Sequence, residues 1–170
     1  MYNVQWIKNI YFKEDTSMRV LTDVEIRNLG FDPADYDRMY ALNGTNTFIR
    51  YVQGYYSGFI SHGKVITPPT YTPAARLVAN RYIIADIFKF TDCHNKSRLI
   101  DALTGEVLVE GFGAYFLQND TYLGFRVNGK SMADHRWGVF SLEERKVVHA
   151  PNLKYVEIHP YVDQLVGKED

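Results

Sequence analysis

The chain has 170 residues, of which 46% are hydrophobic and 23% charged, so it is long enough to fold as one domain with its own core. The formal net charge of −1 and the single cysteine argue against a basic nucleic-acid-binding domain and exclude an intramolecular disulfide. No stretch resembles a signal peptide or reaches the roughly 18 apolar residues of a membrane span. We therefore expect a cytoplasmic protein, of the producing or a host cell, with no membrane partner.

The N-terminal 46 residues predict a hairpin followed by a short helical segment. Residues 4–7 and 18–21 are apolar enough to form two strands on either side of a polar turn. Thr22 and Glu25 then have the spacing of a capping box, and Gly30 supplies a helix stop. The first helix is therefore expected to lie between Thr22 and Gly30.

A second helix is expected from Asp32 to about Leu42. Asp is favoured at the N-cap and Pro at the first helical position, which Asp32 and Pro33 satisfy. Tyr36, Met39 and Tyr40 would then form an apolar stripe on one side of this helix. The prediction for the segment is thus two short helices.

From residue 47 onward, a unit of one strand and one hairpin recurs about every 40 residues. The hairpins begin at Gly58, Arg98 and Gly138, and each has two bulky apolar residues followed by a small polar one. The strands that precede them are predicted at residues 47–52, 82–87 and 122–127.

The hairpin turns are expected to differ between the units. Gly63 and Gly105 offer the positive φ that tight turns require. Arg145 stands at the corresponding place in the third hairpin. We therefore expect the third turn to be longer or differently shaped.

One such unit cannot bury its apolar face alone, so the units must pack on one another. The predicted fold is mainly β (β-rich α+β), with three repeats in an antiparallel sheet or partial propeller; a β-trefoil is the alternative. Residues 1–170 form one domain in this interpretation. It comprises an N-terminal hairpin and helical segment (1–46), the repeat region (47–161) and a polar tail (162–170).

The segment Ser57–Tyr71 resembles the WG-repeat family. Units of that family read roughly Trp-Gly-hydrophobic-Ile-Asp, a Gly-Lys turn, a Val or Ile strand, Pro-Pro and an aromatic residue. Trp137 and Gly138 carry the dipeptide itself, whereas the middle unit has Arg98 and Leu99 there. The resemblance covers residues 47–161 and implies a β-repeat interaction scaffold without an active site.

Candidate chemistry is sparse. Neither Cys93 with His94 nor His135 has a helical metal-ligand spacing, and no phosphate-binding loop or nucleophile elbow is present. We expect no metal, no cofactor and no catalytic residue. The alternative is an enzyme that uses these three residues with Asp101 or Asp134.

The predicted activity is therefore binding, with a protein as the expected partner, as in a small viral or bacterial inhibitor or immunity-type protein. The alternative ligand is a carbohydrate, because Tyr rings on repeated hairpins can stack on sugars. Nucleic acid is not favoured, and a β-edge offers a route to a homo-oligomer. The candidate binding residues are Asp35, Tyr36, Asp37, Arg50, Tyr55, Tyr56 and Tyr71.

Overall fold

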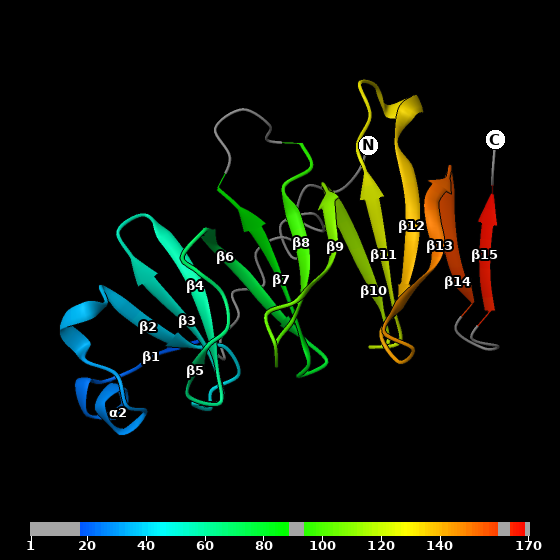
Figure 1. Ribbon diagram of the computed structural model, residues 1–170. Coiled ribbons are helices and arrows are strands. Elements are labelled where there is room, and N and C mark those ends of the chain that lie inside the picture. Colours follow the sequence, from blue (N-terminus) through cyan, green and yellow to red (C-terminus); the bar gives the residue numbers. More distant parts are fainter. Residues whose placement is uncertain (1–17, 89–93, 160–163, 169–170) are drawn as a thin grey trace, which may run out of the picture.

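A computed structural model describes residues 18–88, 94–159 and 164–168 of the chain. The fold is mainly β, as predicted, and its strands pair antiparallel with strands close to them in sequence. Figure 1 shows the strands following one another across the molecule from β1 to β15. None of the sheets in these three stretches closes into a barrel.

In that part of the chain the strands form three sheets. The first contains β1 (Arg19–Val20), β2 (Arg38–Ala41), β3 (Phe48–Gln53), β4 (Tyr56–Ser61), β5 (Lys64–Val65), β6 (Tyr71–Val78), β7 (Tyr82–Ile87), β8 (Ser97–Asp101) and β9 (Val107–Phe112). The second contains β10 (Ala114–Gln118), β11 (Tyr122–Val127), β12 (Arg136–Ser141) and β13 (Lys146–Leu153). The third pairs β14 (Tyr155–His159) with β15 (Gln164–Lys168), so part of the predicted polar tail is a strand.

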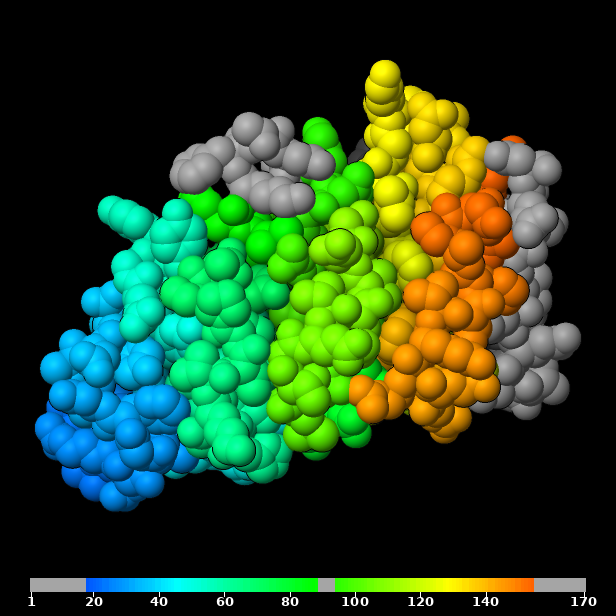
Figure 2. All heavy atoms as spheres, in the orientation of Figure 1, coloured from blue at the N-terminus to red at the C-terminus, as the bar shows by residue number. Residues whose placement is uncertain are grey.

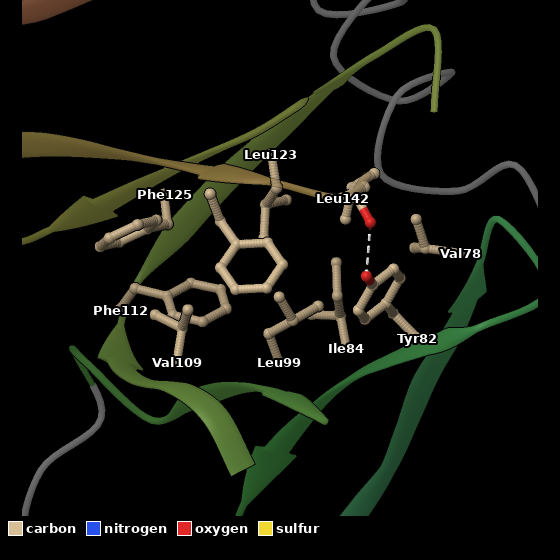
Figure 3. Close-up of a cluster of buried hydrophobic side chains, with 10 residues drawn as sticks. Val78, Tyr82, Ile84, Leu99, Val109, Phe112, Leu123, Phe125 and Leu142 are labelled. Atoms are coloured by element: carbon tan, nitrogen blue, oxygen red, sulfur yellow. Dashed lines mark hydrogen bonds between the residues drawn. The ribbon is translucent and has the colours of Figure 1, made fainter. Parts of the chain in front are cut away.

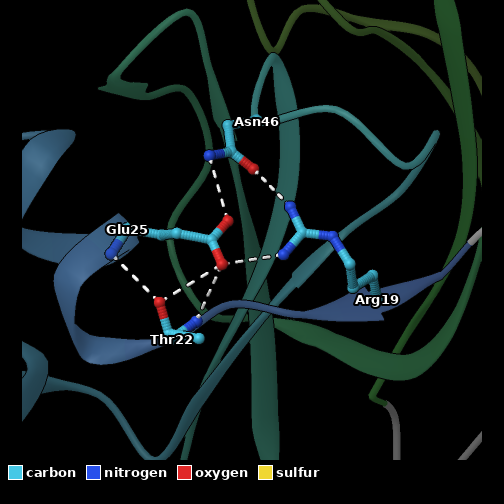
Figure 4. Close-up of polar contacts among 4 residues, drawn as sticks. All are labelled: Arg19, Thr22, Glu25 and Asn46. Carbon is cyan, nitrogen blue, oxygen red and sulfur yellow. Dashed lines mark hydrogen bonds and ion pairs between the residues drawn. The ribbon is translucent and has the colours of Figure 1, made fainter.

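The first predicted helix is confirmed as α2 (Asp23–Asn28), with Gly30 at a φ of 91° just beyond it. The Thr22 hydroxyl accepts a hydrogen bond from the Glu25 amide, and the Glu25 carboxylate accepts one from the Thr22 amide. Figure 4 shows that Arg19 and Asn46 also bind this carboxylate, Arg19 at 2.8 Å. The Arg19 hydrogen bond is the main reason that the pKa of Glu25 is lowered to about 2.

The second predicted helix is wrong. Only a 3₁₀ turn, η1 (Pro33–Asp35), follows Asp32, whose side chain accepts a hydrogen bond from the Ala34 amide. The chain then extends into β2, because pairing with β3 outweighs the local preference for helix. Met39 is buried against α2, whereas Tyr40, adjacent in the strand, lies on the other side of the sheet against Arg50.

The strands predicted for the repeated units are confirmed as β3, β7 and β11, and the three hairpins as β4–β5, β8–β9 and β12–β13. In each unit, the residue after the first hairpin strand donates its N–H to the carbonyl of the residue before the upstream strand. These hydrogen bonds are His62 to Thr47 (2.9 Å), Ala102 to Arg81 (2.8 Å) and Leu142 to Thr121 (2.9 Å).

The three strand pairs stack face to face as layers, which we call the first (β3–β4), second (β7–β8) and third (β11–β12) layers. The first and third layers cover the two faces of the second layer. Because side chains alternate between the faces of a strand, residues of the second layer are buried on both sides. Ile83 and Ile100 pack toward the first layer. Ile84 and Leu99 pack toward the third, and Figure 3 shows them among the apolar side chains of that layer.

The second and third layers are also joined by a hydrogen bond through this core. The hydroxyl of Tyr82 donates to the carbonyl oxygen of Leu142 at 2.6 Å (Figure 3). The Tyr82 ring also meets the ring of Phe140 edge to face, at a centroid distance of 5.9 Å. The buried hydroxyl is thus satisfied by the neighbouring layer.

The third hairpin turn is longer than the first, as predicted, but it forms the same turn hydrogen bond as the second, which the prediction had grouped with the first. Arg145 has a φ of 57° and donates its amide to the Ser141 carbonyl at 2.8 Å. Gly105, at a φ of 78°, makes the same 2.8 Å hydrogen bond to Asp101. The first turn is the shorter one, because His62 and its neighbouring glycine alone connect β4 to β5. Arg145 therefore occupies a conformation that ordinarily favours glycine.

Glycine and aromatic residues are paired in the first and third layers. Tyr51 lies opposite Gly58, and Phe125 lies opposite Gly138; in both pairs the ring occupies the space where a Cβ on the glycine would stand. The second layer has Ala85 opposite Arg98 at this position. In the middle unit both residues of this pair are therefore different: alanine replaces the aromatic residue, and arginine replaces the glycine.

Burial of Tyr51 makes the stability of the protein sensitive to alkaline pH. Its hydroxyl donates to the Thr67 carbonyl at 2.7 Å, and burial raises its pKa to about 12 from an ordinary value near 10. The neutral phenol is thus favoured in the folded chain, and this contribution is complete below pH 10 and is lost as the pH rises toward 12.

We expect Tyr51→Phe to lower the free energy of unfolding by about 1 kcal/mol at pH 7, because the hydrogen bond is lost. The difference from wild type should narrow between pH 10 and pH 12, since phenylalanine does not titrate. Denaturant titrations of both proteins at pH 7 to 12 measure this difference. A gap that stays constant over the whole range would contradict the assignment.

Candidate functional site

The most exposed aromatic side chain among the candidate residues is Tyr55, at the tip of the β3–β4 hairpin. Its side chain is 86% exposed, and Gly54 beside it has a φ of 64° that allows the tight turn. In Figure 1 this tip lies at the same end of the molecule as the β11–β12 connection. The hairpin turns after β4, β8 and β12 lie at the opposite end.

The segment that follows η1 fixes the position of this tip. The Asp37 carboxylate accepts a hydrogen bond from the Gly54 amide at 2.5 Å, and the Asp37 amide donates to the Val52 carbonyl at 2.9 Å. The Gln53 side chain donates to the Asp35 carbonyl at 3.0 Å. A tip that is tied down in this way presents Tyr55 in a defined position.

Two further aromatic rings lie beside this tip, one from the start of β4 and one from the residue after β7. Tyr56 and Phe88 are partly exposed and meet edge to face, with ring centroids 5.3 Å apart. The sequence analysis did not identify Phe88, which follows β7 without any local signal of exposure. We call Asp35, Asp37, Tyr55, Tyr56 and Phe88 together the Tyr55 surface.

Tyr36 does not belong to the exposed part of this surface. Its ring packs edge to face against Phe31 and Tyr51, at centroid distances of 5.8 and 5.4 Å. Burial raises the pKa of Tyr36, in keeping with this position. Its role is to connect the segment after η1 to the core of the first layer.

Arg50 and Tyr71 were predicted as parts of an exposed recognition surface, but both are buried. Tyr71 is 2% exposed and packs against Phe59, and Arg50 is 6% exposed. Arg50 faces the second layer because its strand neighbours face the other way. The alternation of side chains along a strand shows which residues share a face with Arg50. The sequence does not show which of the two faces another layer would cover.

Among the candidate catalytic residues that the structure describes, Asp101 is not assembled with the histidines. Cys93 lies outside the described residues. His94 and His135 lie in the connections that precede β8 and β12, while Asp101 is at the far end of β8. Asp134 is exposed and accepts a hydrogen bond from the Ser131 hydroxyl at 2.9 Å. The strand therefore separates Asp101 from the histidines that it was expected to assist.

The two connections that carry these histidines do contact each other. Asn95 donates to the Asn128 carbonyl at 2.9 Å and accepts from the Asn128 amide at 2.8 Å. The side chain of Asn128 also donates to the carbonyl of His94 at 3.0 Å. These amide contacts connect the second and third layers at the end opposite the hairpin turns.

Asp101 instead forms a buried ionic cluster. Its side chain is 1% exposed and binds Arg81 at 3.5 Å and Arg145 at a shorter distance. Its other oxygen accepts a hydrogen bond from the Leu103 amide at 2.8 Å. The sequence does show that Asp101 stands where the first and third hairpins have a serine, which marks the middle unit as different at this position.

The return strands of the hairpins present a row of exposed valines that the sequence analysis did not identify. β9 and β13 each end their sheet, so each has an edge without a partner strand among the described residues. Val65, Val107 and Val147 occupy corresponding positions on the three return strands. Figure 2 shows that successive parts of the chain form bands of colour from the N-terminal to the C-terminal side of the face in view.

Searches for other kinds of site had negative results. Within residues 18–88, 94–159 and 164–168, no three or more His, Cys, Asp or Glu side chains form a group that could hold a metal ion. No helix in the described part of the chain is long and apolar enough to cross a lipid bilayer. Comparison of the chain with protein-family models, curated proteins and solved structures found no match.

Proposed function

We propose that the protein is a non-catalytic binding module and that the Tyr55 surface contacts a partner protein. The observation that supports this most directly is the 86% exposure of Tyr55 on a hairpin tip held by Asp37. An aromatic ring presented by a rigid backbone can be buried by a partner at little cost in conformational entropy. Tyrosine is also among the residues that contribute most to protein interfaces.

The charges beside Tyr55 indicate the chemistry of the partner. Asp35 and Asp37 are exposed, and neither forms an ion pair with any cation in the described part of the chain. Exposed carboxylates next to an aromatic anchor favour a partner with a basic rim, and they accelerate its association at low salt. This combination suits an inhibitor or immunity-type protein built on a WG-like scaffold.

A carbohydrate-binding function has less support. Sugar stacking on every repeat would require exposed rings at equivalent positions, but Tyr51 and Phe125 are both buried against glycine. Tyr55 and Tyr56 therefore form one aromatic surface, and the buried rings of the repeated units do not add equivalent surfaces to it. A glycan array that bound wild type but not Tyr55→Ala would favour carbohydrate over protein.

Substitution of Tyr55 tests the proposal. We expect Tyr55→Ala to weaken partner binding at least about tenfold, because the loss of a central aromatic contact costs about 2 kcal/mol. Wild type and variant should be used as baits in parallel affinity purifications, and the affinity of any partner then measured by calorimetry. The folded state should be unchanged, since the ring makes no core contact.

Met132→Ala is the matched control, since Met132 is 84% exposed but lies in the β11–β12 connection. Met132→Ala should bind the partner as tightly as the wild type does. In a separate measurement, partner binding by the wild type should weaken as the salt concentration rises. A partner that bound wild type and Tyr55→Ala equally well would overturn the assignment of this surface. Failure to recover any protein partner would count against the binding function itself.

A further inference from the structure

Two arginines face the space between the first and second layers. Arg98 stands where the other two layers have glycine, and it points toward the first layer beside Tyr71. Arg50 comes from the first layer and faces the second. Ser57, which binds Arg50, and Tyr71, which binds Arg98, are paired across β4 and β6. The two arginines thus bind side chains of paired residues on β4 and β6.

Neither arginine is well satisfied by its surroundings. Arg50 donates to the Ser57 hydroxyl at 3.0 Å and to the Met18 sulfur at 3.9 Å, and its Nε has no partner. Arg98 reaches the Tyr71 hydroxyl and the Glu110 carboxylate only at 3.4 Å, and its Nε is also without a partner. Buried donors without acceptors are costly and uncommon in folded proteins.

The charge of this space is unbalanced as well. Arg50 is 6% exposed and forms no ion pair with a described carboxylate. Its charge is offset in part by Tyr40, whose ring centroid lies 4.4 Å away and whose hydroxyl favours the charged guanidinium. Desolvation lowers its pKa, which reflects the cost of keeping the charge there. The Glu110 side chain that pairs with Arg98 is itself 67% exposed. Among residues 18–88, 94–159 and 164–168, these two cations therefore have no buried carboxylate as an ion-pair partner.

We propose that this space is a binding site for a small oxyanion, a phosphate or carboxylate group held by Arg50 and Arg98. Arginine donates paired hydrogen bonds to both kinds of group, and such charge-assisted bonds are stronger than those to Ser57 or Met18. The hydroxyl of Tyr71 provides a further donor beside Arg98. The Arg98 side chain is 25% exposed and provides the approach from solvent.

Thermal unfolding in phosphate, acetate and chloride at equal ionic strength tests this site. Inorganic phosphate or acetate should raise the melting temperature of the wild-type chain saturably, since a ligand of the folded state stabilises it, and chloride should not. The preferred anion distinguishes a phosphate-bearing from a carboxylate-bearing natural ligand. Isothermal calorimetry with the same salts should give one site per chain.

Arg98→Met and Arg50→Met keep an unbranched apolar stem in place of the arginine and remove the charged guanidinium group. Each should weaken anion binding at least tenfold, whereas the control Arg76→Met, on an exposed position of β6, should bind as wild type. Arg98→Met decides the outcome if Arg50→Met does not fold. Absence of saturable binding, or equal binding by wild type and Arg98→Met, would overturn the proposal.

Discussion

The double substitution Arg81→Met and Arg145→Met is expected to lower the free energy of unfolding by about 3 kcal/mol or more. Both cations bind the same carboxylate oxygen of Asp101, whose side chain is 1% exposed. Their removal leaves a buried charge with one backbone hydrogen bond, from the Leu103 amide. Denaturant titration at neutral pH measures the loss, and either single variant should lose less because one cation remains.

A third substitution distinguishes the charge from the packing of the two arginines. Asp101→Ser, introduced into the double variant, should recover most of the lost stability, because Ser61 and Ser141 occupy the same register position in the other layers. Serine there removes the unpaired charge and keeps a hydroxyl for the turn. A double variant within about 0.5 kcal/mol of wild type would show that the cluster contributes little.

Gly105→Ala is expected to cost about 3 kcal/mol, from two sources. A positive φ of 78° is unfavourable for alanine by about 1 kcal/mol, and overpacking against a fixed neighbour adds about 2 kcal/mol. The added Cβ would overlap the backbone carbonyl of Ile66, which a side-chain rotation cannot relieve. Thermal or denaturant unfolding of the variant gives the total.

Gly111→Ala separates these two sources, since Gly111 has nearly the same φ, 77°, but open space around its Cα. The free energy of unfolding of Gly111→Ala should fall only by the backbone contribution, about 1 kcal/mol. The difference between the two variants then reports the contact between the second turn and the first unit. Equal losses of stability in the two variants would show that the backbone at Ile66 moves to accommodate the new methyl group without a cost in free energy.

Much of the β architecture could be predicted from the sequence because its signals are local. Gly63 and Gly105 mark turns between β-branched or apolar stretches, and all three hairpins were placed correctly. The segment after Asp32 was not, because its Asp-Pro start and i, i+3, i+4 stripe are helix signals, whereas Met39 and Ala41 are buried with the alternation of a strand. Only the pairing of β2 with β3, which local sequence does not encode, decides between them.

The candidate site was predicted only in part. Tyr55 was identified correctly as exposed, because a hairpin tip leaves its side chains in solvent. Tyr71 and Arg50 were misplaced, since their exposure depends on which layer covers which face, a long-range property. Asp101 was considered as a catalytic partner, although its cations come from positions 20 residues before it and 44 after it in the chain.

The order of the layers has a consequence for how the chain folds. Each layer consists of strands that are adjacent in sequence, so the strand pairs within a layer form over short loops, whereas contacts between layers, such as that of Asp101 with Arg145, join residues far apart in the chain. Pairing within a layer is therefore expected to precede the docking of layers, which closes the longer loops, and each completed layer then serves as a template for the next. The second layer, buried on both faces, depends on both neighbours, whereas the first has α2 on its other face. Damage to the middle unit therefore propagates in both directions along the stack.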